Sequence, residues 1–140
     1  MFEVNVYTGC VCSGNPGLGA YGALVVCGKN ELKLSGHSEG NTTNHRMELT
    51  AAVEAVEKLK KPCNITVHTN NNFVCHGIAE LDNLPALEWK TKTGATWKHS
   101  DLLKRLYNAK HDVGHAIRFK YEPETDPECK KMASAAMEVQ

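Results

Sequence analysis

The chain has 140 residues, of which 41% are hydrophobic and 23% are charged. This length and composition fit one globular domain with an ordinary buried core. Sixteen lysines and arginines balance sixteen aspartates and glutamates, which excludes a strongly basic protein that adheres to nucleic acid through its net charge. The chain has no apolar run long enough to cross a bilayer and no signal-peptide pattern at its start. We therefore expect a single domain over residues 1–140, located in the cytoplasm.

Six cysteines are scattered along the chain without a Cys-x-x-Cys pair: Cys10, Cys12, Cys27, Cys63, Cys75 and Cys129. This spacing favours buried, reduced thiols over a disulfide framework or a zinc knuckle. A zinc site built from Cys10, Cys12 and His68 is an alternative, provided that the first strand is still extended at the two cysteines.

Hydrophobic alternation predicts three strands in the first part of the chain. Phe2, Val4 and Val6 alternate with polar residues before the turn sequence at 14–17, and this pattern predicts a strand that ends in a tight loop. Two extended runs follow, at 21–27 and 31–34, and the turn cluster between them predicts a hairpin.

The pattern becomes helical after the hairpin. Apolar residues recur at helical spacing over 47–59, with Thr42, Thr43 and Asn44 as candidate caps, and Pro62 stops this helix. A buried strand is expected at 65–69 and a second helix around 73–78.

The remainder of the chain alternates between irregular and regular patterns. Residues 81–99 form an irregular stretch, after which Ser100 is expected to cap a helix. Residues 115–121 predict a last strand, with Ile117, Phe119 and Tyr121 on one face, and an alanine-rich helix follows Pro127. The whole order predicts an α/β domain in which helices cover a mixed sheet.

Three segments together carry a resemblance to a known family. They are Thr-Gly-Cys-Val-Cys-Ser-Gly-Asn-Pro-Gly at 8–17, Thr-Thr-Asn-His-Arg-Met-Glu-Leu at 42–49 and His-Thr-Asn-Asn-Asn-Phe-Val at 68–74. In this order and spacing the chain resembles the type 1 ribonuclease H family. The resemblance implies an α/β, ribonuclease H-like fold, with a five-stranded mixed sheet of order 3-2-1-4-5 flanked by helices. It also implies hydrolysis of the RNA strand of an RNA-DNA hybrid, at four carboxylates that bind two Mg²⁺ ions.

The resemblance assigns those four carboxylate positions to residues that are mostly not acidic here. Glu48 matches the second carboxylate, but Gly9 stands at the first, Asn70 at the third and Lys130 at the fourth. Pro123 replaces the mobile histidine of the family. Because Mg²⁺ prefers anionic oxygens and a lysine repels it, we expect no bound metal, with Mg²⁺ or Mn²⁺ required only if nuclease activity persists.

Four acidic residues near Lys130 offer a route to a rebuilt site. Glu122, Glu124, Asp126 and Glu128 lie close in sequence to this position and could direct one carboxylate toward Glu48. A solvated acidic loop is the competing interpretation, and we favour it because the first strand offers no central ligand.

The resemblance also implies contacts with the nucleic acid. The matching positions are Asn15, Thr43, Asn44, Asn72, Trp89 and Lys98. Three of them have a structural interpretation as well: Asn15 closes a turn, Thr43 caps a helix and Trp89 is an ordinary packing residue. Residues 81–88 lack the cluster of lysine and arginine that precedes the tryptophan in well-known members, and this loss weakens the expected binding.

These observations lead to three hypotheses about function. The first is a pseudoenzyme that binds RNA-DNA hybrid or double-stranded RNA weakly, in a salt-sensitive way and without cleaving it. The second is a structural module with a protein partner, built on a ribonuclease H scaffold. The third is a divergent metal-dependent ribonuclease H with a rebuilt active site. The missing carboxylates make the first hypothesis our expectation.

Overall fold

The computed structural model describes residues 1–14, 16–72, 74–75, 81–91, 93–94 and 98–138. Its five strands form one sheet in the order β3-β2-β1-β4-β5, which confirms the predicted order. The strands are β1 (Phe2–Cys12), β2 (Gly19–Cys27), β3 (Asn30–His37), β4 (Cys63–Thr69) and β5 (Ala116–Tyr121). The helices are α1 (Asn44–Glu57), α3 (Ser100–Val113) and α4 (Pro127–Met137), with a short 3₁₀ helix, η1, at Leu81–Asn83.

Strand pairing makes the sheet mixed. β1 pairs with β2 and β2 with β3 in antiparallel fashion, while β1–β4 and β4–β5 are parallel. Gly28 adopts a φ of 60° in the hairpin turn, a conformation that glycine reaches without steric cost. The parallel β1–β4 pair requires a crossover, and α1 provides it.

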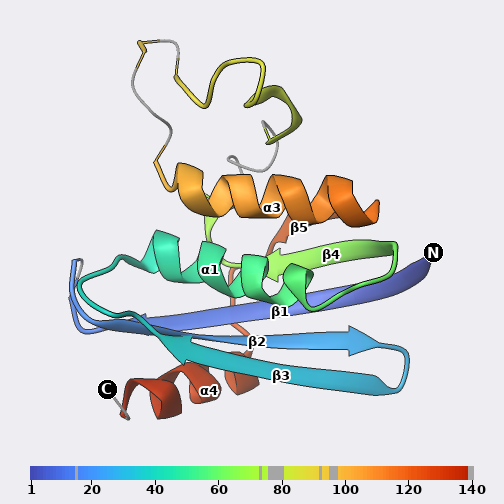
Figure 1. The fold of residues 1–140 in the computed structure, drawn as a ribbon. Helices are drawn as coiled ribbons and strands as arrows, with labels where there is room; N and C mark the ends of the chain where they lie inside the picture. The colour runs from blue at the N-terminus through green and yellow to red at the C-terminus, as the bar shows by residue number, and fades with distance from the viewer. Residues whose placement is uncertain (15, 73, 76–80, 92, 95–97, 139–140) are drawn as a thin grey trace.

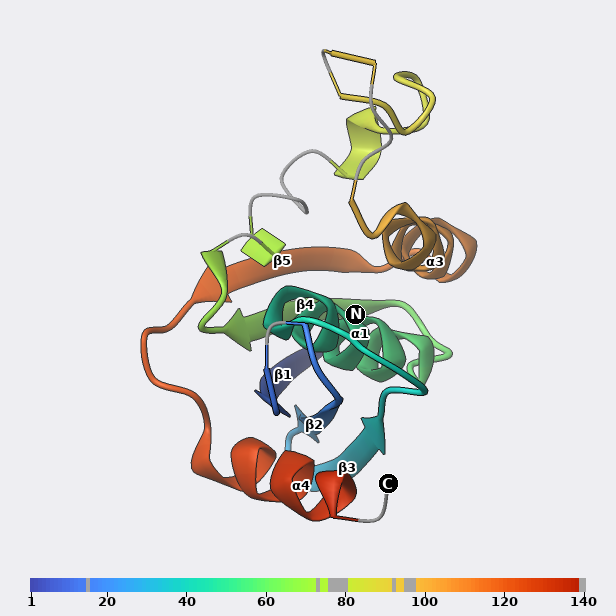
Figure 2. The ribbon, with the colours of Figure 1, turned by 90° about the vertical axis from the view of Figure 1, so that its left-hand side faces the viewer.

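The helices cover both faces of the sheet (Figures 1 and 2). α1 packs on β1 and β2, and α3 packs on α1, whereas α4 lies on the opposite face against β1, β2 and β3. The core lies between α1 and the sheet, where Val4, Val6, Ile65 and Val67 are buried together with Val53 of α1. The single predicted core is therefore present.

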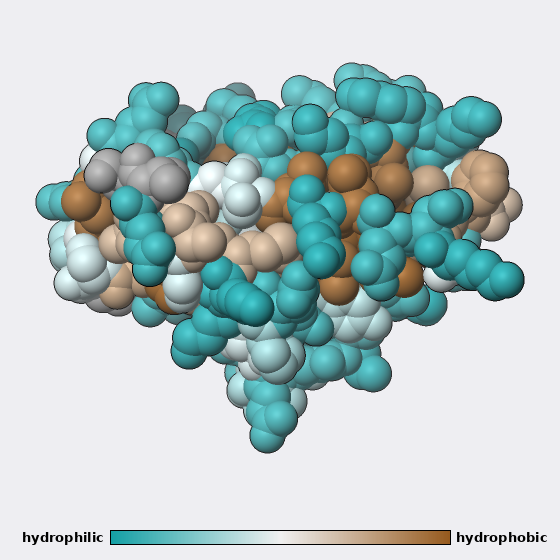
Figure 3. Space-filling model, turned by 90° about the horizontal axis from the view of Figure 1, so that it is seen from below, coloured by the Kyte–Doolittle hydropathy of each residue, from teal (hydrophilic) through white to brown (hydrophobic). Residues whose placement is uncertain are grey.

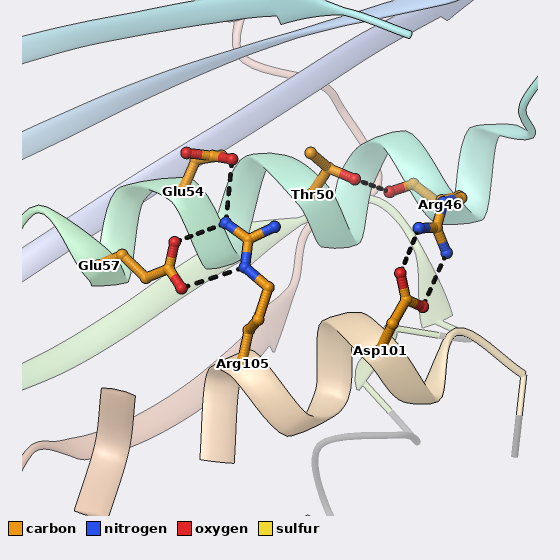
Figure 4. A network of polar contacts seen from close by, with 6 residues as sticks. All are labelled: Arg46, Thr50, Glu54, Glu57, Asp101 and Arg105. Carbon is orange, nitrogen blue, oxygen red and sulfur yellow. Dashed lines mark hydrogen bonds and ion pairs between the residues drawn. The ribbon is translucent and has the colours of Figure 1, made fainter. Parts of the chain in front are cut away.

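Two arginines fix α3 alongside α1 (Figure 4). Arg46 of α1 donates to both carboxylate oxygens of Asp101, at 3.1 and 2.5 Å. Arg105 of α3 reaches back to Glu54 at 3.0 Å and to Glu57 at 2.5 Å. Because these side chains are partly exposed, each pair stabilises the fold by about 1 kcal/mol or less, and their main effect is to orient the two helices.

Two glycines allow α4 to approach the sheet closely. A Cβ at Gly22 would collide with the carbonyl oxygen of Cys129, and a Cβ at Gly9 would lie 3.0 Å from the backbone nitrogen of Lys130. The thiol of Cys129 donates to the carbonyl of Tyr7 at 3.2 Å. Seen from below, hydrophobic surface lies beside hydrophilic side chains on this side of the molecule (Figure 3).

The structure corrects several details of the sequence prediction. Thr43 is confirmed as the cap of α1, since its hydroxyl accepts from the backbone nitrogen of Arg46. Ser100 is not a cap but the first residue of α3: the cap is His99, in a left-handed conformation and with no side-chain capping bond. Of the three residues predicted to share one face of β5, Ile117 and Phe119 are partly buried against the core, whereas Tyr121 is 45% exposed. The helix predicted around 73–78 lies largely outside the described residues.

The structure also bears on the thiols and on membrane association. All six cysteines are free, and Cys63 and Cys129 are buried, which agrees with the expected reduced thiols. None of the helices within the described ranges is long and apolar enough to span a membrane.

Candidate active site

A polar pocket lies where β1 and β4 end beside the start of α1. Its volume is about 310 Å³. Eight residues from five separate parts of the chain line it: Cys10, Asn44, His45, Glu48, Asn70, Asn71, Thr125 and Lys130. Because β1 and β4 run parallel, their carboxyl ends meet at one edge of the sheet, which is where ligands commonly bind in α/β folds.

Glu48 is the one acid among the residues that line this pocket, and it is deeply buried. Only 2% of the residue is exposed, and burial raises its pKa from 4.5 to about 7, against the opposing effect of hydrogen bonds with Thr8 and Thr69. Within the described ranges, its Oε2 atom is buried without a hydrogen-bond partner. A buried carboxylate oxygen without a partner is costly, so this atom is available to a ligand, a cation or a proton.

Two asparagines at the end of β4 form part of the pocket wall. The amide nitrogen of Asn70 donates to the hydroxyl of Thr125 at 2.6 Å, and that of Asn71 donates to His45 at 2.6 Å. The Asn71 side-chain oxygen accepts from the backbone nitrogen of Val74 at 3.1 Å. These bonds link β4 to α1 and to the loop before α4, so the two amides are held in place.

Cys10 lines the pocket together with Glu48 and Lys130. Its thiol is 3.7 Å from the backbone and side-chain oxygens of Asn44. The pKa of this thiol is raised to about 12, mainly by burial and also by Glu48 and Cys12, while Lys130 acts in the opposite direction. In the absence of a metal ion, Cys10 is therefore a neutral thiol at physiological pH.

A second pocket adjoins the first and shares Asn70 and Thr125 with it. Its volume is about 230 Å³, and Tyr7, Thr8, His68, Thr69, Glu122, Glu124, Asp126 and Pro127 complete the lining. His68 stacks on Tyr7, with ring centroids 4.5 Å apart. The carboxylate of Glu122 lies 2.6 Å from Nδ1 of this histidine, which holds the pKa of Glu122 below its usual range.

Three of the four loop acids are engaged away from Glu48. Glu122 pairs with His68, Asp126 caps α4 by accepting from the backbone nitrogen of Cys129, and Glu128 forms an ion pair with Lys33 at 2.8 Å. Glu124 lines only the second pocket. None of these four acids is among the residues that line the Glu48 pocket.

The pocket contains five of the residues selected from the sequence: Cys10, Asn44, Glu48, Asn70 and Lys130. Gly9 adjoins it, because the space next to its Cα is filled by Thr125, Cys129 and the backbone of Lys130. Pro123 is exposed in the loop between β5 and α4. The assignment of catalytic roles to these positions stays a prediction.

Of the described residues predicted to contact nucleic acid, only Asn44 is among those that line the Glu48 pocket. Thr43 is occupied as the cap of α1, while Asn72 and Lys98 are exposed. Trp89 packs edge-on against Tyr107, with Lys104 5.5 Å from its ring centre, so the packing interpretation of this residue fits its surroundings. Asn15 lies outside the described residues.

Sequence reasoning missed three residues of the pocket: His45, Asn71 and Thr125. His45 and Asn71 are immediate neighbours of Asn44 and Asn70, so their adjacency to two candidates was an available signal. Thr125 also adjoins two candidates, Glu124 and Asp126, but its place in the pocket depends on how the loop after β5 folds back toward Asn70.

The donor set does not fit the two-Mg²⁺ centre that the resemblance implies. The pocket combines one carboxylate with three amides, one hydroxyl, one imidazole, a neutral thiol and a lysine. Across the described parts of the chain, no group of three or more His, Cys, Asp and Glu side chains could hold a metal ion, which also leaves the zinc alternative of Cys10, Cys12 and His68 without support. Mg²⁺ needs anionic oxygens, and one glutamate does not replace four carboxylates.

Comparison with known proteins defines the class to which this fold and site belong. Residues 2–123 match the RNase H family, and the chain therefore belongs to this family. The chain is 46% identical to ribonuclease H of Cupriavidus pinatubonensis over 76% of its length and 73% of that protein. It is 35% identical to ribonuclease H of Chlorobium luteolum over 97% of its length and 96% of that protein.

Solved structures support the same fold. LC11-RNase H1 in complex with RNA/DNA hybrid is similar with a TM-score of 0.75 at 19% identity, covering 97% of both chains. LC9-RNase H1, described as a type 1 RNase H with the type 2 active-site motif, has a TM-score of 0.78 at 20% identity. The similarity covers 99% of this chain and 74% of LC9-RNase H1.

These relatives correct the expected function. The sequence led us to expect a pseudoenzyme that binds without cleaving, but relatives 42–46% identical to the chain are named ribonuclease H or ribonuclease HI. The expectation of a pseudoenzyme was wrong because it inferred a loss of activity from the missing carboxylates alone. The chain retains a pocket in which a buried acid is available for chemistry.

Proposed function

We propose that this protein is a divergent ribonuclease H that cleaves the RNA strand of an RNA-DNA hybrid, with the Glu48 pocket as its reactive centre. One observation carries the proposal: in a member of this family, a deeply buried glutamate with one unpartnered carboxylate oxygen lines a polar pocket at the carboxyl ends of β1 and β4. The relatives named ribonuclease H support it.

Glu48 has the properties of a group that moves protons near neutral pH. With a pKa of about 7, the carboxyl group is present in both protonation states under physiological conditions, as general acid–base catalysis requires. In this proposal the Glu48 carboxylate accepts a proton from a water molecule whose oxygen bonds to phosphorus, while the bond from phosphorus to the 3′-oxygen of the RNA breaks and the departing oxygen takes a proton from solvent. The hydrogen bonds with Thr8 and Thr69 hold the carboxyl group in position while it does so.

The amides of the pocket suit the substrate of such a reaction. Asn44, near the start of α1, and Asn70, at the end of β4, present polar groups at one opening. Amide side chains and helix starts bind phosphate and sugar oxygens, and RNA differs from DNA by its 2′-hydroxyl. Weak binding, binding of double-stranded RNA and a protein partner stay predictions.

Cleavage of a labelled hybrid tests this function. Tag-free protein, prepared from a host without its own ribonuclease H, is incubated with a hybrid whose RNA strand carries a 5′ label, in Mg²⁺, in Mn²⁺ and in EDTA. We expect cuts in the hybrid but not in single-stranded RNA, double-stranded RNA or duplex DNA. Glu48→Gln should lower the rate by about 100-fold or more, the scale of a positioned acid or base.

Glu39→Gln is the matched control, because it makes the same chemical change at an exposed residue. Its rate should equal that of the wild type. Absence of hybrid cleavage under all three conditions would overturn the proposal. Equal cleavage by Glu48→Gln and the wild type would also overturn it, since the activity would then arise elsewhere.

A further inference from the structure

Lys130 has no role in the function proposed above, although it lines the same pocket as Glu48. It lies on the first turn of α4, and that turn is seated tightly on the sheet because Gly9 leaves room for the backbone of Lys130. The position of its Cα is thus fixed, while its side chain is long and exposed. In the portion of the chain that the structure describes, no ion pair engages its ammonium group.

The charge of Lys130 acts inside this pocket. Glu48 raises the pKa of the Cys10 thiol and Lys130 lowers it, and all three residues line the same pocket. The pocket therefore contains one buried acid with an unpartnered oxygen and one positive charge. Its lining provides no set of anionic ligands for a divalent ion.

We propose that the Lys130 ammonium is the resident cation of this pocket and binds a backbone phosphate of the nucleic acid beside Glu48, in the place of a divalent metal ion. A phosphate requires a positive partner, and a lysine binds it as a flexible point charge. The ammonium group then lies between two anions, the phosphate and the Glu48 carboxylate. The ligand class, a phosphodiester of an RNA-DNA hybrid, rests on the proposed function.

Lys130 and its neighbour Lys131 have different surroundings. Lys131 follows directly on α4 and is also exposed, but it acts on Glu128, whose carboxylate pairs with Lys33 of β3. Lys131 does not line the Glu48 pocket. The two lysines carry the same formal charge on the same helix, so Lys131 is a matched control for non-specific attraction.

Hybrid binding without metal tests the proposal. Fluorescence anisotropy of a labelled RNA-DNA hybrid is measured in EDTA for the wild type, Lys130→Ala and Lys131→Ala, with urea unfolding to verify that both variants are folded. We expect Lys130→Ala to weaken binding about tenfold and to reduce the salt slope by about one. Lys131→Ala should change the dissociation constant by less than about twofold.

A second variant tests directly whether the Lys130 ammonium takes the place of a divalent metal ion. Lys130→Asp puts a second carboxylate near Glu48, and its hybrid binding should become dependent on added Mg²⁺, whereas wild-type binding should be the same in Mg²⁺ and EDTA. Equal effects of Lys130→Ala and Lys131→Ala would overturn the proposal. Wild-type binding that disappears in EDTA would overturn it too.

The two proposals fail in different experiments. If the wild type binds in EDTA through Lys130 but cleaves nothing, the lysine assignment stands and the nuclease function fails. If the wild type cleaves the hybrid while Lys130→Ala and Lys131→Ala bind it equally well, the nuclease function stands and the lysine assignment fails.

Discussion

At the scale of single residues, burial changes the protonation and the hydrogen bonding of Glu48. A glutamate on a helix is ordinarily a solvated acid, but this one is enclosed between α1 and the ends of two strands. Burial disfavours the charged form, and the two threonine hydroxyls only partly offset that effect. The same enclosure leaves Oε2 without a partner, so chemical availability and a cost to stability arise from one cause.

The raised pKa of Glu48 predicts a pH-dependent effect on stability. The folded state binds a proton more tightly than the unfolded chain, so the stabilising contribution is complete below about pH 4.5 and is lost as the pH rises through about 7. Glu48→Gln keeps the shape without the charge. The free energy of unfolding of Glu48→Gln minus that of the wild type should increase by roughly 2 to 3 kcal/mol from pH 5 to pH 8.5.

Urea unfolding of both proteins at the two pH values checks this prediction. Glu39→Gln is the control, because that carboxylate is exposed and carries no cost of burial. A difference between Glu48→Gln and the wild type that stays constant from pH 5 to pH 8.5 would contradict the shift of the pKa.

At the scale of elements, the seating of α4 determines the geometry of the site. α4 carries Lys130, and the loop before it carries Thr125, so both reach the pocket only while the helix lies against β1 and β2. Gly9 and Gly22 make this approach possible, because neither presents a Cβ to the first turns of α4. An aspartate at Gly9 would have to displace the backbone of Lys130, so the change that restores an acid there also disturbs the helix.

Gly22→Ala tests the seating of α4. The added methyl group would collide with the carbonyl oxygen of Cys129, and overpacking against a fixed backbone costs about 1 to 3 kcal/mol or more. We expect a lower urea midpoint and faster hydrogen exchange over residues 127–137. Gly40→Ala is the control, because a Cβ there meets no atom within 4 Å; similar losses in the two variants would show that α4 does not depend on this contact.

At the scale of the whole molecule, the absence of net charge limits how the protein reaches nucleic acid. Sixteen positive and sixteen negative side chains provide little long-range attraction, and several cations are paired within the protein, among them Arg46 and Arg105. We therefore expect affinity for a hybrid to come from a few local contacts rather than from the net charge.

The weak overall field predicts a shallow dependence of binding on salt. A plot of log Kd against log salt concentration for the RNA-DNA hybrid should have a slope of about 3 or less, equivalent to about three neutralised phosphates. Titrations from 50 to 300 mM salt by fluorescence anisotropy measure it. A slope of about 6 or more would show that an extended basic surface binds the duplex.

Local sequence patterns determined most of the architecture. Alternating apolar residues predicted the strands, helical spacing together with Thr43 predicted α1, and the turn at 28–30 predicted the hairpin. These features depend on neighbouring residues, so the chain encodes them locally. The cap of α3 was misplaced because His99 adopts a left-handed conformation that no helix-start signal reveals. The family and the order of the sheet followed from three motifs read together.

The sequence by itself determined which residues are present: one acid at position 48, an amide at 70, a lysine at 130 and acids in the loop at 122–128. Only the tertiary structure decided what they can do. It buried Glu48 and left Oε2 unpartnered, it paired Glu122 with His68 and Glu128 with Lys33, and it placed Lys130 in the pocket. The reason is physical: pKa, pairing and access depend on burial and on neighbours distant in sequence, and these exist only once the chain has folded.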